Sequence, residues 1–342
     1  MENYHEIKDR ESFSSISALA DGPKEYIRFK EKVEDVIPDY FIKGKIVDDL
    51  RCLNPVNNEN IEKYFDDNFT INTLDTPTGQ DYLLATYLIE KFNSHLDITN
   101  EAILDAIKEL VIYGSTKKEE LLLAKYKQVE DYVIFNINNK NSDKKVISFE
   151  IYSSCLDIIY SLIGDETVSP YMNNESAEDI EVCNELPILW ELTFGDTNIL
   201  MKSKLDKVIV NKVDKTIQVL DFKTTGDNTS KFTKSYIQFK YYYQASIYLT
   251  ALHYKQVKEE WYSDYTILPF KFIVGNDSSK PLVFTVNDND IKLSTFGENR
   301  IGFKRVKGWM ELLKDLIWYN ENGFETEKEY KLNGSYELKV FE

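Results

Sequence analysis

The chain has 342 residues, of which 42% are hydrophobic and 29% are charged, with a net charge of −17 at pH 7. That length and composition are typical of a globular protein with one large or two modest domains. No apolar run approaches the ~20 residues of a membrane span, and the N-terminus lacks the apolar stretch of a signal peptide, so we expect a cytoplasmic protein with no membrane partner.

Two short helices are predicted at 13–34. Ser14 or Ser15 can cap the first helix, because a hydroxyl can accept a hydrogen bond from a free backbone N–H of the first turn. Gly22 and Pro23 separate it from the second helix.

A third helix is predicted at 39–53, where the apolar residues recur at helical spacing. Gly44 lies inside this helix and costs about 1 kcal/mol relative to alanine, which indicates close approach of another backbone or a ligand. Further predicted elements are helices at 80–93, 101–113 and from 117 onward, a strand at 132–135, a loop at 139–141 and a helix at 146–163.

The second half of the chain is richer in strands. Strands are predicted at 186–194, 199–210, 217–224, 270–274 and 282–286, with helices at 234–254 and 298–321. This order predicts an α+β fold with a mixed central sheet. We expect a mainly helical part over 1–175 and a core with the sheet over 176–342, joined in one integrated domain.

The hairpin between the second and third of these strands carries two acids. If its turn is centred between Val213 and Asp214, then Asp206 lies directly opposite Asp221, with Cβ atoms roughly 4.5–5.5 Å apart. Two carboxylates at that distance repel each other, and a bound divalent cation would relieve the repulsion. Oxygen ligands of this kind suit Mg²⁺ or Mn²⁺.

Lys223 follows Asp221 by two residues, so both side chains point to the same face of the strand. A lysine there can orient a water or, as the neutral amine, deprotonate it, and its ammonium form can stabilise negative charge developing on a phosphate. The Asp-x-Lys pattern alone is weak evidence, because it recurs at 143–145 and 290–292. A surface hairpin of mixed charge is the alternative interpretation.

The charge is unevenly distributed along the chain. Residues 201–255 contain ten lysines and four aspartates, a net charge of +6, which leaves −23 for the remainder. A locally basic segment around the candidate site is compatible with binding DNA. A solvated lysine face is the alternative.

Several segments together resemble the RecB-like branch of the PD-(D/E)XK nuclease superfamily, and within it the phage-type recombination exonucleases related to RecE. The matching segments run in family order at 15–26, 44–50, 55–69, 185–190, 204–206, 221–225 and 244–248. The last of them matches the Q-x-x-x-Y motif of that branch. The resemblance covers most of the chain and implies a restriction-endonuclease-like core.

The resemblance also implies roles for individual residues. Asp206 and Asp221 would bind the metal together with the backbone carbonyl of Phe222, and Lys223 would position the attacking water. Asp48 stands where many relatives have a histidine ligand, and Glu185 could complete the metal shell; a surface acid is the alternative for each. Gln244 and Tyr248 would reach the cleft together from one helix face.

The sequence departs from the family pattern at its cysteines. Some relatives hold an iron–sulfur cluster with four cysteines, whereas this chain has only Cys52, Cys155 and Cys183, widely spaced. We therefore expect free thiols and no iron–sulfur cluster. The histidines, His5, His95 and His253, are also scattered, which argues against zinc and against a Ser-His-Asp triad.

The sequence thus predicts a Mg²⁺-dependent deoxyribonuclease, with Mn²⁺ as a substitute, that digests double-stranded DNA ends as an exonuclease in recombination or replication. A structure-specific or restriction-like endonuclease and a catalytically silent DNA-binding protein are the alternatives. A single-strand annealing protein and further copies of the chain are the expected protein partners, by analogy alone.

Overall fold

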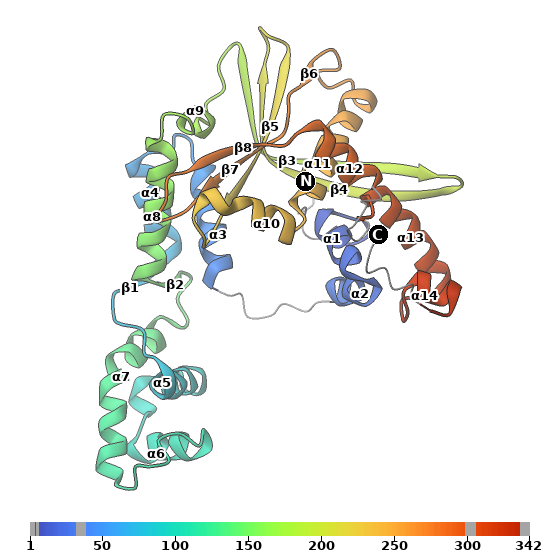
Figure 1. The fold of residues 1–342 in the computed structure, drawn as a ribbon. Helices are drawn as coiled ribbons and strands as arrows, with labels where there is room; N and C mark the ends of the chain where they lie inside the picture. Colours follow the sequence, from blue (N-terminus) through green and yellow to red (C-terminus); the bar gives the residue numbers. More distant parts are fainter. Residues whose placement is uncertain (1–3, 5–6, 32–38, 298–305, 336–342) are drawn as a thin grey trace. The chain divides into compact units, whose positions relative to one another are not determined.

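The computed structural model describes residues 4, 7–31, 39–297 and 306–335, and the chain divides into two compact units (Figure 1). Unit 1 comprises Met1–Pro55 and Ile158–Glu342, and unit 2 comprises Val56–Asp157. These boundaries differ from the one expected at 175, because the segment with Asp48 belongs to the same unit as the central sheet.

Unit 1 is an α+β structure, as predicted. Its strands are β3 (Ile180–Phe194), β4 (Thr197–Asn211), β5 (Thr216–Thr224), β6 (Thr266–Ile267), β7 (Lys271–Gly275) and β8 (Leu282–Thr285). Its helical segments are α1 (Phe13–Asp21), α2 (Pro23–Glu31), α3 (Asp39–Arg51), α9 (Ser169–Met172), η2 (Thr229–Lys231), α10 (Phe232–Gln238), α11 (Tyr241–Lys258), α12 (Asp288–Phe296), α13 (Trp309–Asn322) and α14 (Lys328–Asn333).

The central sheet is mixed and has the strand order β3-β4-β5-β7-β8, with β6 pairing to β5. The first three strands are antiparallel, β5 and β7 are parallel, and β7 and β8 are antiparallel. The parallel step requires a crossover, which α10 and α11 provide. Strand β5 is therefore central and is buried over most of its length.

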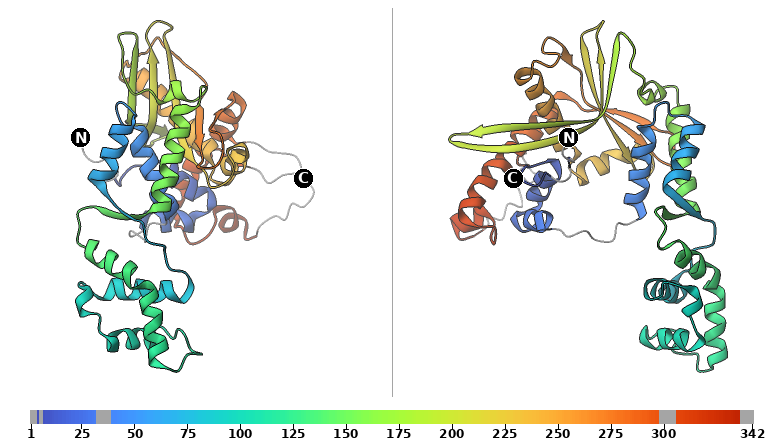
Figure 2. Two further views of the ribbon diagram at one scale, coloured as in Figure 1. Left: turned by 90° about the vertical axis from the view of Figure 1, so that its left-hand side faces the viewer. Right: turned by 180° about the vertical axis from the view of Figure 1, so that it is seen from behind.

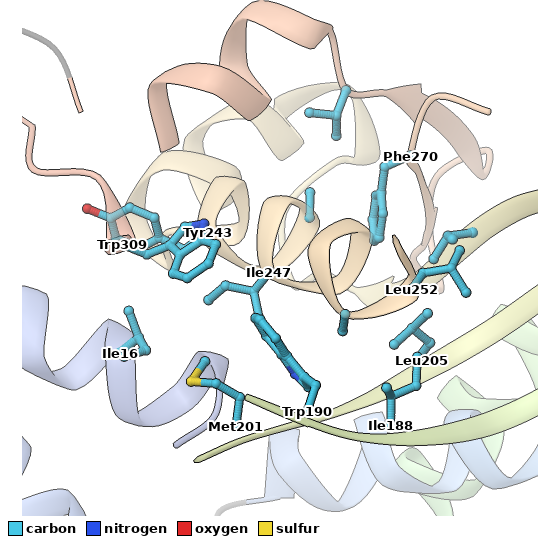
Figure 3. Close-up of a cluster of buried hydrophobic side chains, with 14 of the residues drawn as sticks. Ile16, Ile188, Trp190, Met201, Leu205, Tyr243, Ile247, Leu252, Phe270 and Trp309 are labelled. Atoms are coloured by element: carbon cyan, nitrogen blue, oxygen red, sulfur yellow. The ribbon is translucent and has the colours of Figure 1, made fainter. Parts of the chain in front are cut away.

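The core of unit 1 lies between the sheet and α11. In Figure 3, Trp190 of β3 lies among Ile247 of α11, Met201 of β4 and Trp309 of α13. The indole of Trp190 is fully buried and donates a hydrogen bond of 3.1 Å from Nε1 to Oγ of Ser203. This packing fixes α11 against the sheet.

Strands β3 and β4 continue beyond the other strands as a two-stranded ribbon, because only 207–211 of β4 pair with β5 (Figure 1). The backbone N–H of Glu11 donates to the carbonyl of Leu200, and Lys202 donates back to the carbonyl of Glu11. The N-terminal segment is thereby attached to the ribbon just before α1.

Several boundaries differ from the predictions. Ser12, rather than Ser14 or Ser15, caps α1. The single helix predicted at 234–254 is two helices, because Lys240 has a left-handed backbone conformation with φ of 56°. Part of the helix predicted at 298–321 and of the one ending at 34 lies outside the described residues, and α12 was not predicted.

Unit 2 is mainly helical. It contains α4 (Asn58–Asn68), α5 (Gly79–Lys91), η1 (His95–Asp97), α6 (Asn100–Glu109) and α7 (Glu119–Asn139), and a parallel pair of strands, β1 (Phe69–Asn72) and β2 (Lys145–Ser148). Helix α8 (Phe149–Gly164) begins in unit 2 and continues into unit 1. The predicted helix at 146–163 therefore begins later, after β2.

The strand predicted at 132–135 is wrong, because these residues belong to α7 (Figure 2). The buried residues Tyr126, Val129, Val133 and Ile137 recur every three or four positions and pack with α5 and α6. Burial at helical spacing has overridden the strand preference of the run Tyr-Val-Ile-Phe. No helix in the described part of the chain is long and apolar enough to cross a membrane.

Candidate active site

The β4–β5 hairpin has the predicted register. Lys207 pairs with Leu220, Val208 with Val219 and Val210 with Ile217. Extending this ladder by one step places Asp206 opposite Asp221. The turn is tight and polar, and Asn211 accepts hydrogen bonds from the backbone N–H groups of Val213 and Asp214 within it.

Asp221 is fully buried in the central strand and is held by two side chains. Its Oδ2 lies 2.5 Å from Nζ of Lys223. Its Oδ1 accepts a hydrogen bond of 2.7 Å from Nε2 of Gln244, a buried residue of α11. The structure therefore brings together three of the predicted site residues, two from β5 and one from α11.

Asp206 lies beside this group at the end of the paired part of β4. Its Oδ2 accepts a hydrogen bond of 3.0 Å from the backbone N–H of Phe222, the residue between Asp221 and Lys223. Its side chain retains 16% exposure. A carboxylate bonded to the backbone of the neighbouring strand has a fixed orientation, while its exposed part can still meet a ligand.

Arg51, at the end of α3, was not predicted as a site residue. It is 2% exposed, and its guanidinium donates to Oδ1 of Asp48 at 2.9 Å and to Oε1 of Glu185 at 3.0 Å. It also donates to the backbone carbonyl of Asp206 at 3.2 Å and lies 3.4 Å from Oδ2 of that residue. One arginine therefore contacts three of the four predicted acidic ligands.

Glu185 is opposite Asp206 on β3, at a break in the ladder between the pairs Asn184–Lys207 and Leu186–Leu205. Its φ of 54° is rare for a residue with a side chain. Besides Arg51, its carboxylate forms an ion pair with Lys204. Strained backbone at a cluster of charged side chains is typical of functional sites.

Asp48 and Tyr248 lie nearer the margin of the group. The side chain of Asp48 is half exposed and contacts Arg51. Tyr248 is one turn beyond Gln244 on α11, with its ring 6.4 Å from that of Phe270 in the core. Both are close enough to Asp206 for its charge to influence their ionisation.

Two acids of the group, Asp221 and Asp48, have raised pKa values. Burial and then the nearby Asp206 raise the pKa of Asp221 to about 8, against the opposing effect of Lys223. Partial loss of hydration and the charge of Asp206 also raise the pKa of the half-exposed Asp48 to about 6, against the effect of Arg51. Burial alone would lower the pKa of Lys223, but Asp221 and Asp206 outweigh it and raise the pKa above its usual value. Lys223 is therefore an ammonium group at neutral pH.

The carboxylates of this group are chemically suited to binding a divalent cation. Carboxylate oxygens are the ligands that Mg²⁺ and Mn²⁺ prefer, and the mutual repulsion of Asp206 and Asp221 is what such a cation would relieve. Within the residues that the structure describes, however, no three His, Cys, Asp or Glu side chains converge as a metal site requires. The acids contact Arg51 and Lys223 instead.

Another buried lysine lies next to Asp206 and was also not predicted. Lys207 is 1% exposed, burial and Arg51 lower its pKa to about 7, and its amino group donates at 2.7 Å to the carbonyls of Tyr171 and Asn173 and to Oδ1 of Asn174. Asn174 in turn donates to the carbonyls of Arg51 and Leu53. Lys207 thus connects β4 to the segment around α9 and to the end of α3.

The lysines of the basic segment 201–255 are largely occupied within the protein. Besides Lys207 and Lys223, the lysines with partners are Lys202 (carbonyls of Tyr4 and Ile7), Lys204 (Glu185), Lys212 (carbonyl of Glu178), Lys215 (Asp264), Lys240 (Asp21) and Lys255 (Glu259). The positive charge of this segment is therefore not by itself a DNA-binding surface.

The close approach of a backbone or ligand predicted at Gly44 is not confirmed, because its neighbour is a side chain at an ordinary contact distance. A Cβ atom on Gly44 of α3 would lie 3.4 Å from Oγ1 of Thr224 at the end of β5. An alanine at this position would therefore fit between α3 and β5.

Comparison with known proteins adds little to this description. No family model and no curated protein matches the chain. Among solved structures, one named "Putative exonuclease" from Eubacterium rectale is 13% identical, with a TM-score of 0.46 and coverage of 99% of this chain and 93% of its own. The structure named SSO0001 is 13% identical, with a TM-score of 0.23 and coverage of 77% and 98%, respectively. Both scores are too low to carry an argument.

Proposed function

We propose that the protein is a metal-dependent nuclease that hydrolyses phosphodiester bonds at the ends of duplex DNA. The observation that carries this proposal is the buried group Asp221–Lys223–Gln244, beside which Asp206 is bonded to the backbone of Phe222. The ordered sequence motifs name the same residues independently of the structure.

Each residue has a distinct role in the proposed reaction. Asp206 and Asp221 would hold the cation, with Glu185, Asp48 and the carbonyl of Phe222 as further candidate ligands. A divalent cation bound there would supply electrophilic assistance at the scissile phosphate. Lys223, as an ammonium group, donates a hydrogen bond that orients the attacking water or stabilises charge on the phosphate oxygens.

Gln244 has a positioning role in this account. Its amide donates to Asp221 Oδ1, so it fixes the carboxylate within the strand and leaves the other oxygen facing Lys223. Residues that orient a metal-binding carboxylate in this way commonly contribute 10- to 100-fold to metal affinity or activity, roughly.

A catalytically silent DNA-binding protein is the second candidate, and one observation favours it. Arg51 and Lys223 already neutralise the acids that a metal would require. The two candidates differ in whether the wild-type protein binds divalent cations.

Alanine variants of Asp221 and Lys223 test the proposed function. Both should lose Mg²⁺-dependent cleavage of linear duplex DNA while their circular dichroism spectra stay those of the wild type. Lys215→Ala is a matched control, since Lys215 is an exposed lysine of the same strand region, and it should cleave like the wild type. Wild-type cleavage by both site variants would exclude the assignment.

A further inference from the structure

The surroundings of Arg51 are unusual for an arginine at the end of a helix. Its side chain has 1% exposure, and its contacts come from three separate elements, α3, β3 and β4. The partners are Asp48, Glu185 and both the carboxylate and the backbone carbonyl of Asp206. A guanidinium group suits this position because its five N–H donors point outward in one plane.

The charge balance explains why these contacts form. Three carboxylates gathered in a partly buried place would repel one another, and each would lose hydration without compensation. Arg51 supplies the positive charge at the point where all three can reach it. Asp221, the fourth acid, is paired with Lys223 instead.

We propose that Arg51 is an internal counter-cation, which holds Asp206 and Glu185 while no divalent cation is bound and competes with the cation for these two acids. The inference rests on the proposed function, because it takes Asp206 as a metal ligand. Oδ2 of Asp206 is shared between Arg51, at 3.4 Å, and the N–H of Phe222, at 3.0 Å. A cation that takes this oxygen as a ligand must therefore displace or repel the guanidinium.

Arg51 keeps other contacts when it gives up Asp206 and Glu185. The centre of its guanidinium lies 4.7 Å from the ring centroid of Phe222, a cation–π distance. Its hydrogen bond to Asp48 is within α3. The arginine can thus stay near the site as a second positive charge when a cation and an anionic phosphate are bound.

The test is isothermal titration of Mn²⁺ into the metal-free protein without DNA, for the wild type, Arg51→Met and Lys204→Met. Arg51→Met should bind Mn²⁺ at least about tenfold more tightly, because a close positive charge that repels the cation is removed. Lys204→Met is the matched control, since Lys204 contacts Glu185 alone and is 29% exposed. It should change the affinity by less than about threefold, because exposed ion pairs contribute little.

An Arg51→Met protein that is folded and binds Mn²⁺ no more tightly than the wild type would overturn the inference. If that variant does not fold, the NMR signal of the Arg51 side-chain Nε–H group in the wild type provides the test. Arg51→Lys assigns this signal by its loss. Saturating Mg²⁺ should shift the Nε–H signal and speed up its exchange with solvent. An unchanged signal at saturation would contradict competition between Arg51 and the cation.

Failure of the inference and failure of the proposed function have different signatures. Tight Mn²⁺ binding by the wild type, abolished in Asp221→Asn and unchanged in Arg51→Met, would leave the nuclease proposal intact and remove the inference alone. Binding by neither the wild type nor Arg51→Met would remove both. Binding by Arg51→Met alone would support Arg51 as the competing cation and would favour a silent wild-type protein.

Discussion

Gln244 of α11 donates a hydrogen bond of 2.7 Å to Oδ1 of Asp221 in the centre of β5, and both side chains are buried. The contact links the crossover helix to the strand that carries the candidate metal ligand. Because leaving a buried polar group without its hydrogen bond costs about 1–3 kcal/mol, Gln244 should support the site without touching a substrate itself.

Gln244→Leu should therefore reduce Mn²⁺ affinity and DNA cleavage by roughly 10- to 100-fold, while the similar volume of leucine preserves the packing of α11. Gln256→Leu is the matched control. Gln256 lies on the same helix with the same 5% exposure, but its amide donates to the carbonyls of Tyr262 and Tyr265. It should lower thermal stability without lowering cleavage, and equal loss of activity in both variants would contradict the role of Gln244.

The raised pKa of Asp221 predicts how stability depends on pH in the metal-free protein. An acid whose pKa is higher in the folded than in the unfolded state binds more protons when folded. The free energy of unfolding should therefore fall as pH rises from about 4, the usual range for aspartate, to about 8, the pKa of Asp221 in the protein. The upper limit is about 1.4 kcal/mol per pH unit.

Asp221→Asn should lack this pH-dependent part of the free energy of unfolding. The difference in free energy of unfolding between the wild type and the variant, measured in EDTA by urea denaturation from pH 4 to 9, should change across that window and level off above it. A difference that stays constant over the whole range would show that Asp221 has an ordinary pKa.

Lys207→Met should destabilise the fold by about 2–4 kcal/mol, because it removes the buried donor shared by one buried and two partly buried oxygen acceptors. Lys212→Met is the comparison, since Lys212 is an exposed residue just beyond the same strand; its effect should be under about 0.5 kcal/mol. Urea denaturation of the two variants measures both values. If both variants lowered the free energy of unfolding by similarly small amounts, water would be replacing the hydrogen bonds of the Lys207 amino group.

The hairpin with Asp206 and Asp221 could be predicted because its information is local. A polar turn between two runs of β-branched and apolar residues determines the register, and the register determines which acids face each other. The break between α1 and α2 was predictable for the same reason, from Gly22 and Pro23.

Arg51 was missed because its role depends on three elements that meet only in the folded chain. One local signal was present: Arg51 follows Asp48 by three residues on a predicted helix, a spacing at which side chains of opposite charge meet. Lys207 could also have been noticed, because it is a charged residue within a run of apolar strand residues. The strand predicted at 132–135 failed because strand propensity is weaker than burial on a helix face.

The most direct test of the central claim is cleavage of DNA by the wild-type protein. Linear duplex DNA labelled at its 5′ or 3′ ends is incubated with Mg²⁺ or with EDTA, beside covalently closed circular DNA and a Lys223→Ala control. The account predicts Mg²⁺-dependent loss of the linear DNA alone, absent in the variant, with the order of label release giving the direction of digestion. Nicking of the circle would identify an endonuclease. Intact DNA of both forms, with Mg²⁺ bound to the protein, would contradict the proposed activity.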